Sequence, residues 1–397
     1  MNIIENISIK NFRILRDLNY SPKQINIITG RNNTGKSALL DAIILNVTGC
    51  INWEFKDWII ENPIDLITSG EQIAKISSNF DDVQIFANSD TMQTNLADQT
   101  SLIFSKILRE MKNAAKSGLT KTVFNDETFR VEFFNLFFKY YDIITIASKL
   151  GYVVVPYWRK KENSKLFMNE LTKLIQTYAK NHLDKLSDVD KQEYRKSDFI
   201  RPAIPPSFHL KINEDDDTIV PVFKMTHFDK TVFEDTTDEG LIILEDFINQ
   251  NNLVKNLKRL SNKNVVYKID EQLVTIPINA HGDGFISLLN TIQYFIKSRD
   301  GVLLIEEPEN HLHPGFIEVF IENLFLYCQK LNVQVFMTTH SYDLIQSALK
   351  YANSSNQKDV LLVSKMTADE KTIEKLDYTV DEGIKVIDEM FLDLRGN

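Results

Sequence analysis

The chain has 397 residues, of which 43% are hydrophobic and 25% are charged, and its net charge is −10. Such values are ordinary for a folded protein with two or three domain-sized units, or with one large core that carries an insertion. They exclude a polycation that binds nucleic acid through overall charge, so any contact with DNA must be local.

The chain lacks the patterns that mark export or membrane insertion. Its N-terminus has no basic segment followed by an apolar one, and no apolar run approaches the ~18 residues that a membrane span needs. The most apolar stretch, residues 133–141, is interrupted by polar side chains and is predicted to be buried core. The two cysteines, Cys50 and Cys328, fit no metal spacing. We therefore expect a cytoplasmic protein without membrane contacts.

The first predicted element with a chemical meaning is a strand, a loop and a helix. The apolar residues 25–29 predict the strand, and the apolar run from 38 to 47 predicts the helix. The residues between them read Gly-Arg-Asn-Asn-Thr-Gly-Lys-Ser, which is a complete G-x-x-x-x-G-K-S phosphate loop. This motif in this context indicates a nucleoside triphosphate site, and we expect ATP and Mg²⁺ as its ligands.

Each fixed position of the loop has a physical role. Gly30 and Gly35 let the backbone wrap around phosphate, while the loop N–H groups and the helix N-terminus point at negative charge. Lys36 would reach the β- and γ-phosphates and assist catalysis, and the Ser37 hydroxyl would complete the coordination of Mg²⁺. The expected nucleotide-binding residues of the loop are Gly30, Arg31, Asn32, Asn33, Thr34, Gly35, Lys36, Ser37 and Ala38.

Residues 91–238 show helical and mixed segments without phosphate chemistry, and no heptads are sustained long enough for a coiled coil. We expect a compact, mainly helical insertion lobe here, which separates the N-terminal part of the core (1–90) from its C-terminal part (239–397).

Two basic clusters in the lobe are candidate contacts for nucleic acid. Four cations, Lys106, Arg109, Lys112 and Lys116, fall on one face of a predicted helix and could neutralise DNA phosphates. A solvated helix face is the alternative interpretation. The cluster at 157–161 adds a tyrosine and a tryptophan, which could stack on unpaired bases or pack on the lobe.

Further along, the segment 280–285 reads Ala-His-Gly-Asp-Gly-Phe before another predicted helix. Its residues Gly282, Asp283 and Gly284 leave backbone N–H groups free at a helix start, which makes a second anion site. An ordinary Gly-Asp-Gly turn is the alternative.

A pair of acids follows the apolar residues 302–305. This pattern is typical of a buried parallel strand that delivers carboxylates at its C-terminal edge, where ligands of open α/β sheets bind. Glu306 would orient Mg²⁺ through water, and Glu307 would hold and polarise the water that attacks the γ-phosphate. A core strand that ends in a solvated acidic turn is the alternative.

The next predicted helix, at 316–325, leads to an apolar strand at 333–339 that ends at His340. A histidine at this strand tip can donate a hydrogen bond to the γ-phosphate and so respond to its presence. A purely structural histidine is the alternative. His311 and His313 lie in the loop after the acid pair, and we expect them to make hydrogen bonds rather than to bind a metal.

Together, the phosphate loop, the acid pair and the strand-end histidine resemble the ABC-type P-loop ATPases of the SMC and RecF group. The resemblance is strongest to standalone AAA-type ATPases related to the OLD family, and it covers residues 3–47 and most of 273–395. It implies an α/β fold: an ABC-type ATPase head, here with a mainly helical insertion lobe. It also implies that Arg13, at the end of a first strand, approaches the nucleotide.

In such ATPases a signature loop stands where residues 280–285 lie. It contacts the γ-phosphate bound on a second protomer, so the resemblance implies an ATP-dependent homodimer. The chain departs from the group because no Ser-Gly-Gly-Gln string occurs, and His281 or Ser287 would have to replace it. Glu306 stands where most P-loop enzymes have Asp, but it is similar to what OLD-like members show. The switch-loop glutamine is open, with Gln84 and Gln93 as candidates.

The segment after His340 is shorter than a typical domain of roughly 100 residues. We therefore expect no TOPRIM nuclease domain, but a strand at 359–363 and a helix at 379–394 that close the core.

These features predict a Mg-dependent ATPase that dimerises around ATP and acts on DNA in repair or genome maintenance. The alternative is an ATP-gated scaffold or sensor that controls a separately encoded nuclease or toxin in antiviral defence. A small-molecule kinase is disfavoured, because it explains neither the signature-like loop nor His340.

Overall fold

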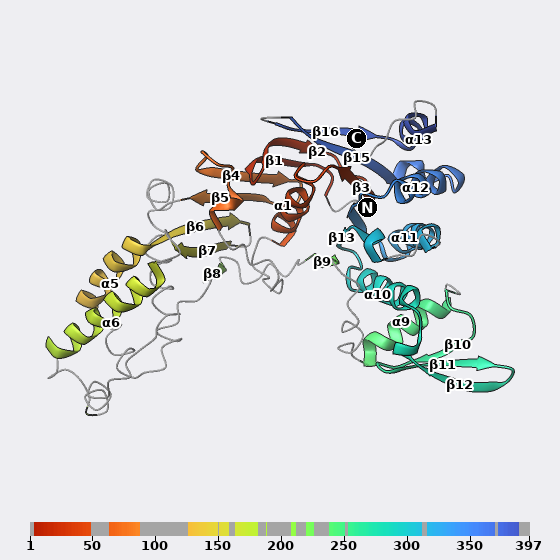
Figure 1. Ribbon diagram of the computed structural model, residues 1–397, viewed down its shortest axis with the longest axis horizontal. Coiled ribbons are helices and arrows are strands. Elements are labelled where there is room, and N and C mark those ends of the chain that lie inside the picture. Colours follow the sequence, from red (N-terminus) through yellow and green to blue (C-terminus); the bar gives the residue numbers. More distant parts are fainter. Residues whose placement is uncertain are drawn as a thin grey trace.

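The computed structural model describes residues 4–48, 63–87, 126–149, 151–158, 163–181, 188, 208–211, 220–225, 238–250, 253–311, 316–369 and 372–388. In these ranges the strands form one six-stranded, one seven-stranded and one three-stranded sheet, with helices packed around them (Figure 1).

The six-stranded sheet positions the candidate site. Its order is β16 (Ile373–Tyr378), β15 (Leu361–Ala368), β3 (Ile25–Gly30), β14 (Gln334–Thr338), β13 (Val302–Glu306) and β9 (Val222–Met225). All neighbours pair in parallel except β16, which is antiparallel to β15. Because β14 pairs with both β3 and β13, the carboxyl ends of these three strands meet at one edge.

Both faces of this sheet are covered, which explains its nearly continuous apolar sequence. On β13, Leu303 and Ile305 belong to the core that the sheet forms with a layer of helices, whereas Val302 and Leu304 belong to the core on the opposite face. The helices of that layer are α9 (Asp238–Gln250), α10 (Asp283–Lys297), α11 (Ile317–Leu331), α12 (Tyr342–Ser354) and α13 (Val380–Asp388) (Figure 1).

Helix α1 (Lys36–Thr48) covers the opposite face and contacts strands of two sheets. On its other side, α1 packs against the antiparallel, seven-stranded sheet. That sheet has the order β2 (Leu15–Tyr20), β1 (Ile7–Phe12), β4 (Ile73–Ser78), β5 (Asp82–Ala87), β6 (Tyr141–Ser148), β7 (Gly151–Trp158) and β8 (Phe208–Lys211). A helix that is buried on all sides reads as apolar all round, and α1 does so from Ala38 to Val47 with only Asp41 and Asn46 as polar exceptions.

Beyond β5, helices α5 (Glu127–Tyr140) and α6 (Asn163–Asn181) project from one end of the molecule (Figure 1). Asp126 caps α5, since its carboxylate accepts hydrogen bonds from the backbone N–H of Thr128 at 2.9 Å and of Phe129 at 3.2 Å. Phe133, Phe137 and Phe167 are buried in the packing of the two helices. The prediction of buried core at 133–141 is confirmed at Phe133 and Phe137.

The three-stranded sheet projects from the other end (Figure 1). It consists of β10 (Leu257–Leu260), β11 (Asn264–Ile269) and β12 (Gln272–Pro277), all antiparallel. Short 3-10 turns complete the described elements: η1 (Pro63–Leu66), η3 (Ile278–Ala280), η4 (Pro308–His311) and η6 (Lys358–Val360).

The α/β class and the predicted order of elements around the phosphate loop, acid pair and histidine are confirmed. The division at residues 90 and 238 stays a prediction. The structure adds that the range 91–238 contributes β6, β7 and β8 to the seven-stranded sheet and β9 to the six-stranded one, besides α5 and α6. Across the described ranges, no helix has both the length and the apolar character needed to cross a bilayer.

Several predicted features lie outside the described residues. They are the basic face Lys106, Arg109, Lys112 and Lys116, the cations of the cluster at 159–161, Gln93, Cys50, His313 and the end of the last helix beyond residue 388.

Candidate active site

The phosphate loop joins β3 to α1 in a conformation that its glycines make possible. Gly30 has a φ of 142° and Gly35 a φ of 91°, and Asn33 adopts φ 63°. A Cβ atom on Gly30 would lie 2.2 Å from the backbone oxygen of Met366 on β15. Position 30 therefore needs glycine both for its backbone angle and for the space.

Lys36 is held across the loop. Its ammonium donates hydrogen bonds of 2.9 Å to the backbone oxygens of Gly30 and of Arg31. Burial lowers the pKa of Lys36, while the nearby charges of Glu307 and Glu309 raise it. Thr34 donates to the oxygen of Arg31 at 2.8 Å, which tightens the same turn. The acceptors of the Lys36 ammonium are thus backbone oxygens of the loop and not carboxylates.

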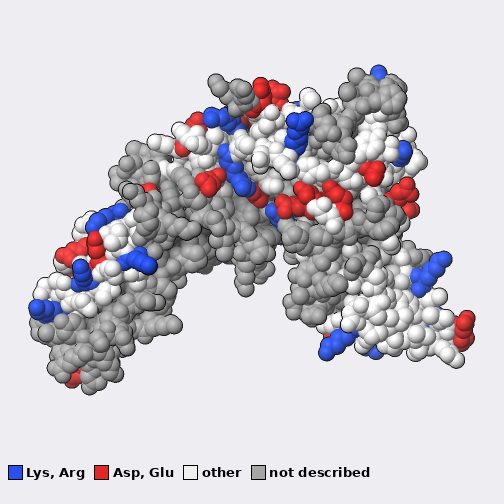
Figure 2. Space-filling model, viewed as in Figure 1, with Lys and Arg blue, Asp and Glu red and all other residues white. Residues whose placement is uncertain are grey.

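A cavity of about 1320 Å³ opens beside the loop and collects residues from distant parts of the chain. It is lined by Arg13, Ile14, Asn32, Asn33, Gly35, Lys36, Ser37, Ala38, Asp65, Lys224, Glu306, Glu307, Asn310 and Thr338. In the space-filling view, acidic and basic side chains lie beside one another in the middle of this face, over the region of α1 and β13 (Figure 2). The structure thus brings the loop, the acid pair and Arg13 together.

The acid pair and His340 meet at the edge of the sheet. Glu307 adopts φ 44°, and its backbone N–H donates to the oxygen of Thr338 at 3.0 Å. Its Oε2 accepts a hydrogen bond from Asn310 Nδ2 at 2.9 Å, and its Oε1 lies 3.5 Å from His340 Nε2. That imidazole nitrogen is buried without a hydrogen-bond partner. The carboxylate is therefore fixed through one oxygen, and the other faces an unsatisfied imidazole.

Sequence reasoning missed Glu309, which ties η4 to the histidine strand. Its Oε1 accepts hydrogen bonds from the Thr339 hydroxyl at 2.7 Å and from the His340 backbone N–H at 2.6 Å. Thr339 Oγ1 in turn accepts from the N–H of Ser341, which caps α12. Glu309 thus positions the backbone that carries His340 from a turn that begins one residue after Glu307.

Sequence reasoning also missed Asp41 and Lys224, two charged residues that contact the predicted Arg13 and Glu306. Arg13, in the turn between β1 and β2, forms an ion pair with Asp41 of α1. Lys224 of β9 places its Nζ 3.8 Å from Asp41 Oδ1 and 3.0 Å from Glu306 Oε1. Burial lowers the pKa of Arg13, and the Asp65 charge raises it. Arg13 lies at the cavity as expected, but here it contacts a protein carboxylate.

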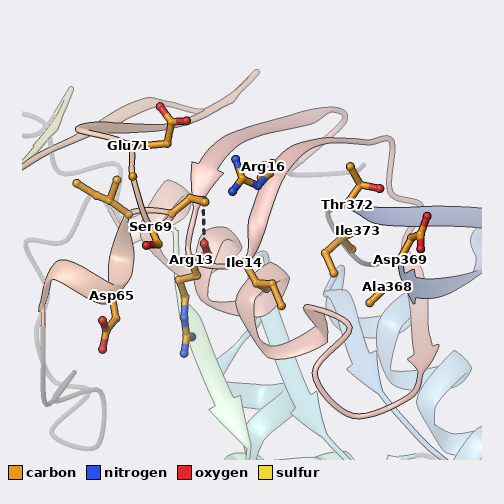
Figure 3. A pocket seen from close by; sticks show the side chains of 13 residues that line it. Arg13, Ile14, Arg16, Asp65, Ser69, Glu71, Ala368, Asp369, Thr372 and Ile373 are labelled. Atoms are coloured by element: carbon orange, nitrogen blue, oxygen red, sulfur yellow. Dashed lines mark hydrogen bonds between the residues drawn. The ribbon is translucent and has the colours of Figure 1, made fainter.

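A second cavity, of about 1010 Å³, adjoins the first and shares Arg13, Ile14 and Asp65 with it. It lies between the β1–β2 turn, the segment 65–71 and the described residues at the end of β15 and the start of β16. Figure 3 shows Arg13 and Asp65 extending on one side of this space, away from Arg16 and Glu71. Asp369 and Thr372 form the opposite wall.

Within one chain, the signature-like loop at 280–285 lies apart from the cavity beside the phosphate loop. Gly282 is exposed and caps α10, which begins with Asp283 and Gly284. The two proposed substitutes for a signature donor are engaged or buried. His281 Nε2 lies 2.9 Å from the Tyr267 hydroxyl and its Nδ1 lies 3.0 Å from the Pro277 oxygen, and Ser287 is buried. The candidate switch residue Gln84 lies on β5, paired with Lys75 and Ala147, and does not line the cavity.

The sequence is similar to that of known ATPases. A family model described as AAA ATPase domain matches residues 1–345. An ATP/GTP phosphatase of Helicobacter pylori is 23% identical over 364 residues, which span 87% of each chain. Endonuclease GajA of Bacillus cereus is 30% identical over 118 residues, which span 25% of this chain and 17% of GajA.

Among solved structures, the SMC head domain from Thermotoga maritima superposes with a TM-score of 0.42 and 11% identity, over 94% of this chain and 98% of that chain. The family model spans most of the sequence and includes the phosphate loop, the acid pair and His340. The chain therefore belongs to the AAA ATPase domain family and is an ATP hydrolase.

Proposed function

We propose that Glu307 activates the water that attacks the γ-phosphate and that His340 contacts this phosphate. The observation that carries the proposal is the contact between them: Glu307 lines the cavity, and its Oε1 lies 3.5 Å from His340 Nε2, which is buried without a hydrogen-bond partner behind it. The Glu307 side chain is 40% exposed, so water reaches it. Asn310 holds one carboxylate oxygen, which leaves the other to accept a proton. Lys36 would exchange its carbonyl partners for phosphate oxygens.

The residues present fit Mg²⁺, which we propose as the metal of the site. Ser37, exposed at the start of α1, and the carboxylate of Glu306 line the same cavity, and Mg²⁺ prefers such oxygen ligands together with phosphates and water. When bound, the ion supplies positive charge to the phosphates as they react. The second cavity, which continues from Arg13, has room for the nucleoside.

We propose further that ATP joins two copies of the chain. Gly282 is exposed at the start of a 15-residue helix, and a Cβ atom there would meet nothing within 4 Å, yet it does not line the cavity of its own chain. Its anion-binding N–H groups would then serve a phosphate held by a second copy.

The proposed dimer is tested with a variant that is expected to bind ATP without hydrolysing it. Glu307→Gln in saturating Mg·ATP is expected to double its mass in light scattering and to return to the monomer mass when ATP is replaced by ADP. Lys36→Ala is the matched control and should stay monomeric in both nucleotides. A Glu307→Gln protein that binds ATP and remains monomeric would contradict the proposal.

We propose DNA as the target of the ATP cycle. Support comes from the basic face predicted at Lys106, Arg109, Lys112 and Lys116, because aligned cations bind phosphates in a salt-dependent way. DNA is expected to raise the steady-state ATPase rate at about 50 mM salt and to do so much less at about 200 mM. Replacing the four cations with Gln should abolish the stimulation, whereas replacing the exposed Lys165, Lys173 and Lys180 of α6 should not.

A second candidate is an ATP-gated scaffold or sensor that controls a separately encoded nuclease or toxin in antiviral defence. The local similarity to an endonuclease, GajA, favours it. Slow hydrolysis that is indifferent to DNA in the same experiment would contradict the first function and support this one.

A further inference from the structure

Lys224 is a cation within the nucleotide cavity that no phosphate-loop motif provides. It lies on β9, the edge strand beside β13, and pairs there with Leu304, two residues before Glu306. Its side chain is only 17% exposed, although it carries a charge. The pairing of β9 with β13 therefore delivers an ammonium to the end of the strand that bears the metal carboxylate.

The contacts of Lys224 are with two carboxylates, of which Glu306 lines the cavity and Asp41 lies behind it. Its Nζ lies 3.0 Å from Glu306 Oε1, which we assign to Mg²⁺, and 3.8 Å from Asp41 Oδ1. Arg13 holds Asp41 from the other side. Two carboxylates and two cations thus balance each other before any ligand binds, and all but Asp41 line the cavity.

This arrangement has a consequence for ligand binding. A divalent cation at Glu306 must share the carboxylate with the ammonium, which opposes it by charge. A polyphosphate in the same cavity, in contrast, is attracted by the ammonium whether or not a metal accompanies it. One side chain therefore acts in opposite directions on the metal and on the phosphates.

We propose that Lys224 is a built-in cation of the nucleotide site that substitutes in part for Mg²⁺ and so lowers the dependence of ATP binding on the metal. The inference rests on the proposed role of Glu306 and Mg²⁺. The quantity it governs is the ratio of two dissociation constants, that of ATP in EDTA divided by that of Mg·ATP.

The test is equilibrium binding of a fluorescent ATP analogue to the full chain, in EDTA and in excess Mg²⁺. Lys224→Met, which keeps an unbranched chain one atom shorter and removes the charge, is expected to weaken binding in EDTA about tenfold and to leave binding of the Mg²⁺ complex unchanged or tighter. The ratio should then rise about tenfold. Lys224→Arg should keep the wild-type ratio. Lys75→Met, at an exposed lysine on β4, is the matched control and should change neither constant.

A purely structural role of Lys224, in which its ion pairs only hold α1, β9 and β13 together, predicts a different pattern. Both constants would then rise together in Lys224→Met, with a lower melting temperature and an unchanged ratio, and this result would overturn the proposal. Lys224→Gln provides a second neutral variant if the Met variant does not fold.

The reciprocal variant adds an independent check. Glu306→Gln releases Lys224 from its partner, so binding in EDTA should tighten and the ratio should fall. An unchanged or higher ratio in Glu306→Gln would overturn the proposal. If the wild type binds the analogue in neither condition, the proposed nucleotide site itself fails; if it binds and only the ratio in the Lys224 variants is unaltered, the inference alone fails.

Discussion

Glu307→Gln is expected to lower the rate of ATP hydrolysis by about 10²- to 10⁴-fold, the range that a lost general base produces. The amide is nearly isosteric with the carboxylate and can keep the contact with Asn310, but it accepts no proton from water. Nucleotide affinity should therefore stay near that of the wild type. The measurements are phosphate release under saturating Mg·ATP and equilibrium binding of the same nucleotide.

The matched control for this variant is Glu309→Gln. Glu309 is also an acid of the segment that follows β13, but it contacts Thr339 and the His340 backbone rather than the cavity. If Glu309→Gln stopped hydrolysis while Glu307→Gln retained it, the assignment of the base would be wrong.

Gly30→Ala is expected to abolish nucleotide binding and to lower the melting temperature markedly. A φ of 142° costs a residue with a Cβ about 1–3 kcal/mol, and the new methyl group would also overlap the backbone oxygen of Met366 at 2.2 Å. Since that oxygen belongs to a paired strand, it cannot move aside without opening β15. The measurements are thermal unfolding and binding of a fluorescent ATP analogue.

Gly70→Ala separates the effect of backbone strain from the effect of steric overlap. Gly70 also has a positive φ, of 91°, but a Cβ there meets nothing within 4 Å. We expect a loss of stability from backbone strain alone, smaller than that of Gly30→Ala, because no atom opposes the new methyl group. Wild-type melting and binding in Gly30→Ala would refute the assigned loop geometry.

The sequence was sufficient to predict the parts of the site that lie in continuous motifs. The loop from Gly30 to Ser37, the acids at the end of β13 and the histidine at the end of β14 each follow an apolar strand. Parallel strands in one sheet bring such positions to one edge, so their meeting could be inferred without knowing the strand order.

Lys224 could not be predicted, because no local pattern states which strand neighbours β13. The position of Lys224 depends on the pairing of Val222–Met225 with a strand about 80 residues later in the sequence, and this pairing is set by the whole sheet. Glu309 was visible in the acidic turn, but its partner Thr339 lies on another strand. The same limit applies to β6, β7 and β8, whose sequences do not reveal which sheet they extend.

The left-handed backbone of Glu307 implies a conflict between durability and turnover. A residue with a Cβ at φ 44° costs about 1–2 kcal/mol, and asparagine or glycine would adopt this conformation more readily. Selection for thermal stability alone would therefore favour replacing the residue that we assign to water activation. A more robust version of this protein chosen by melting temperature would be at risk of becoming a nucleotide-binding protein that no longer turns over.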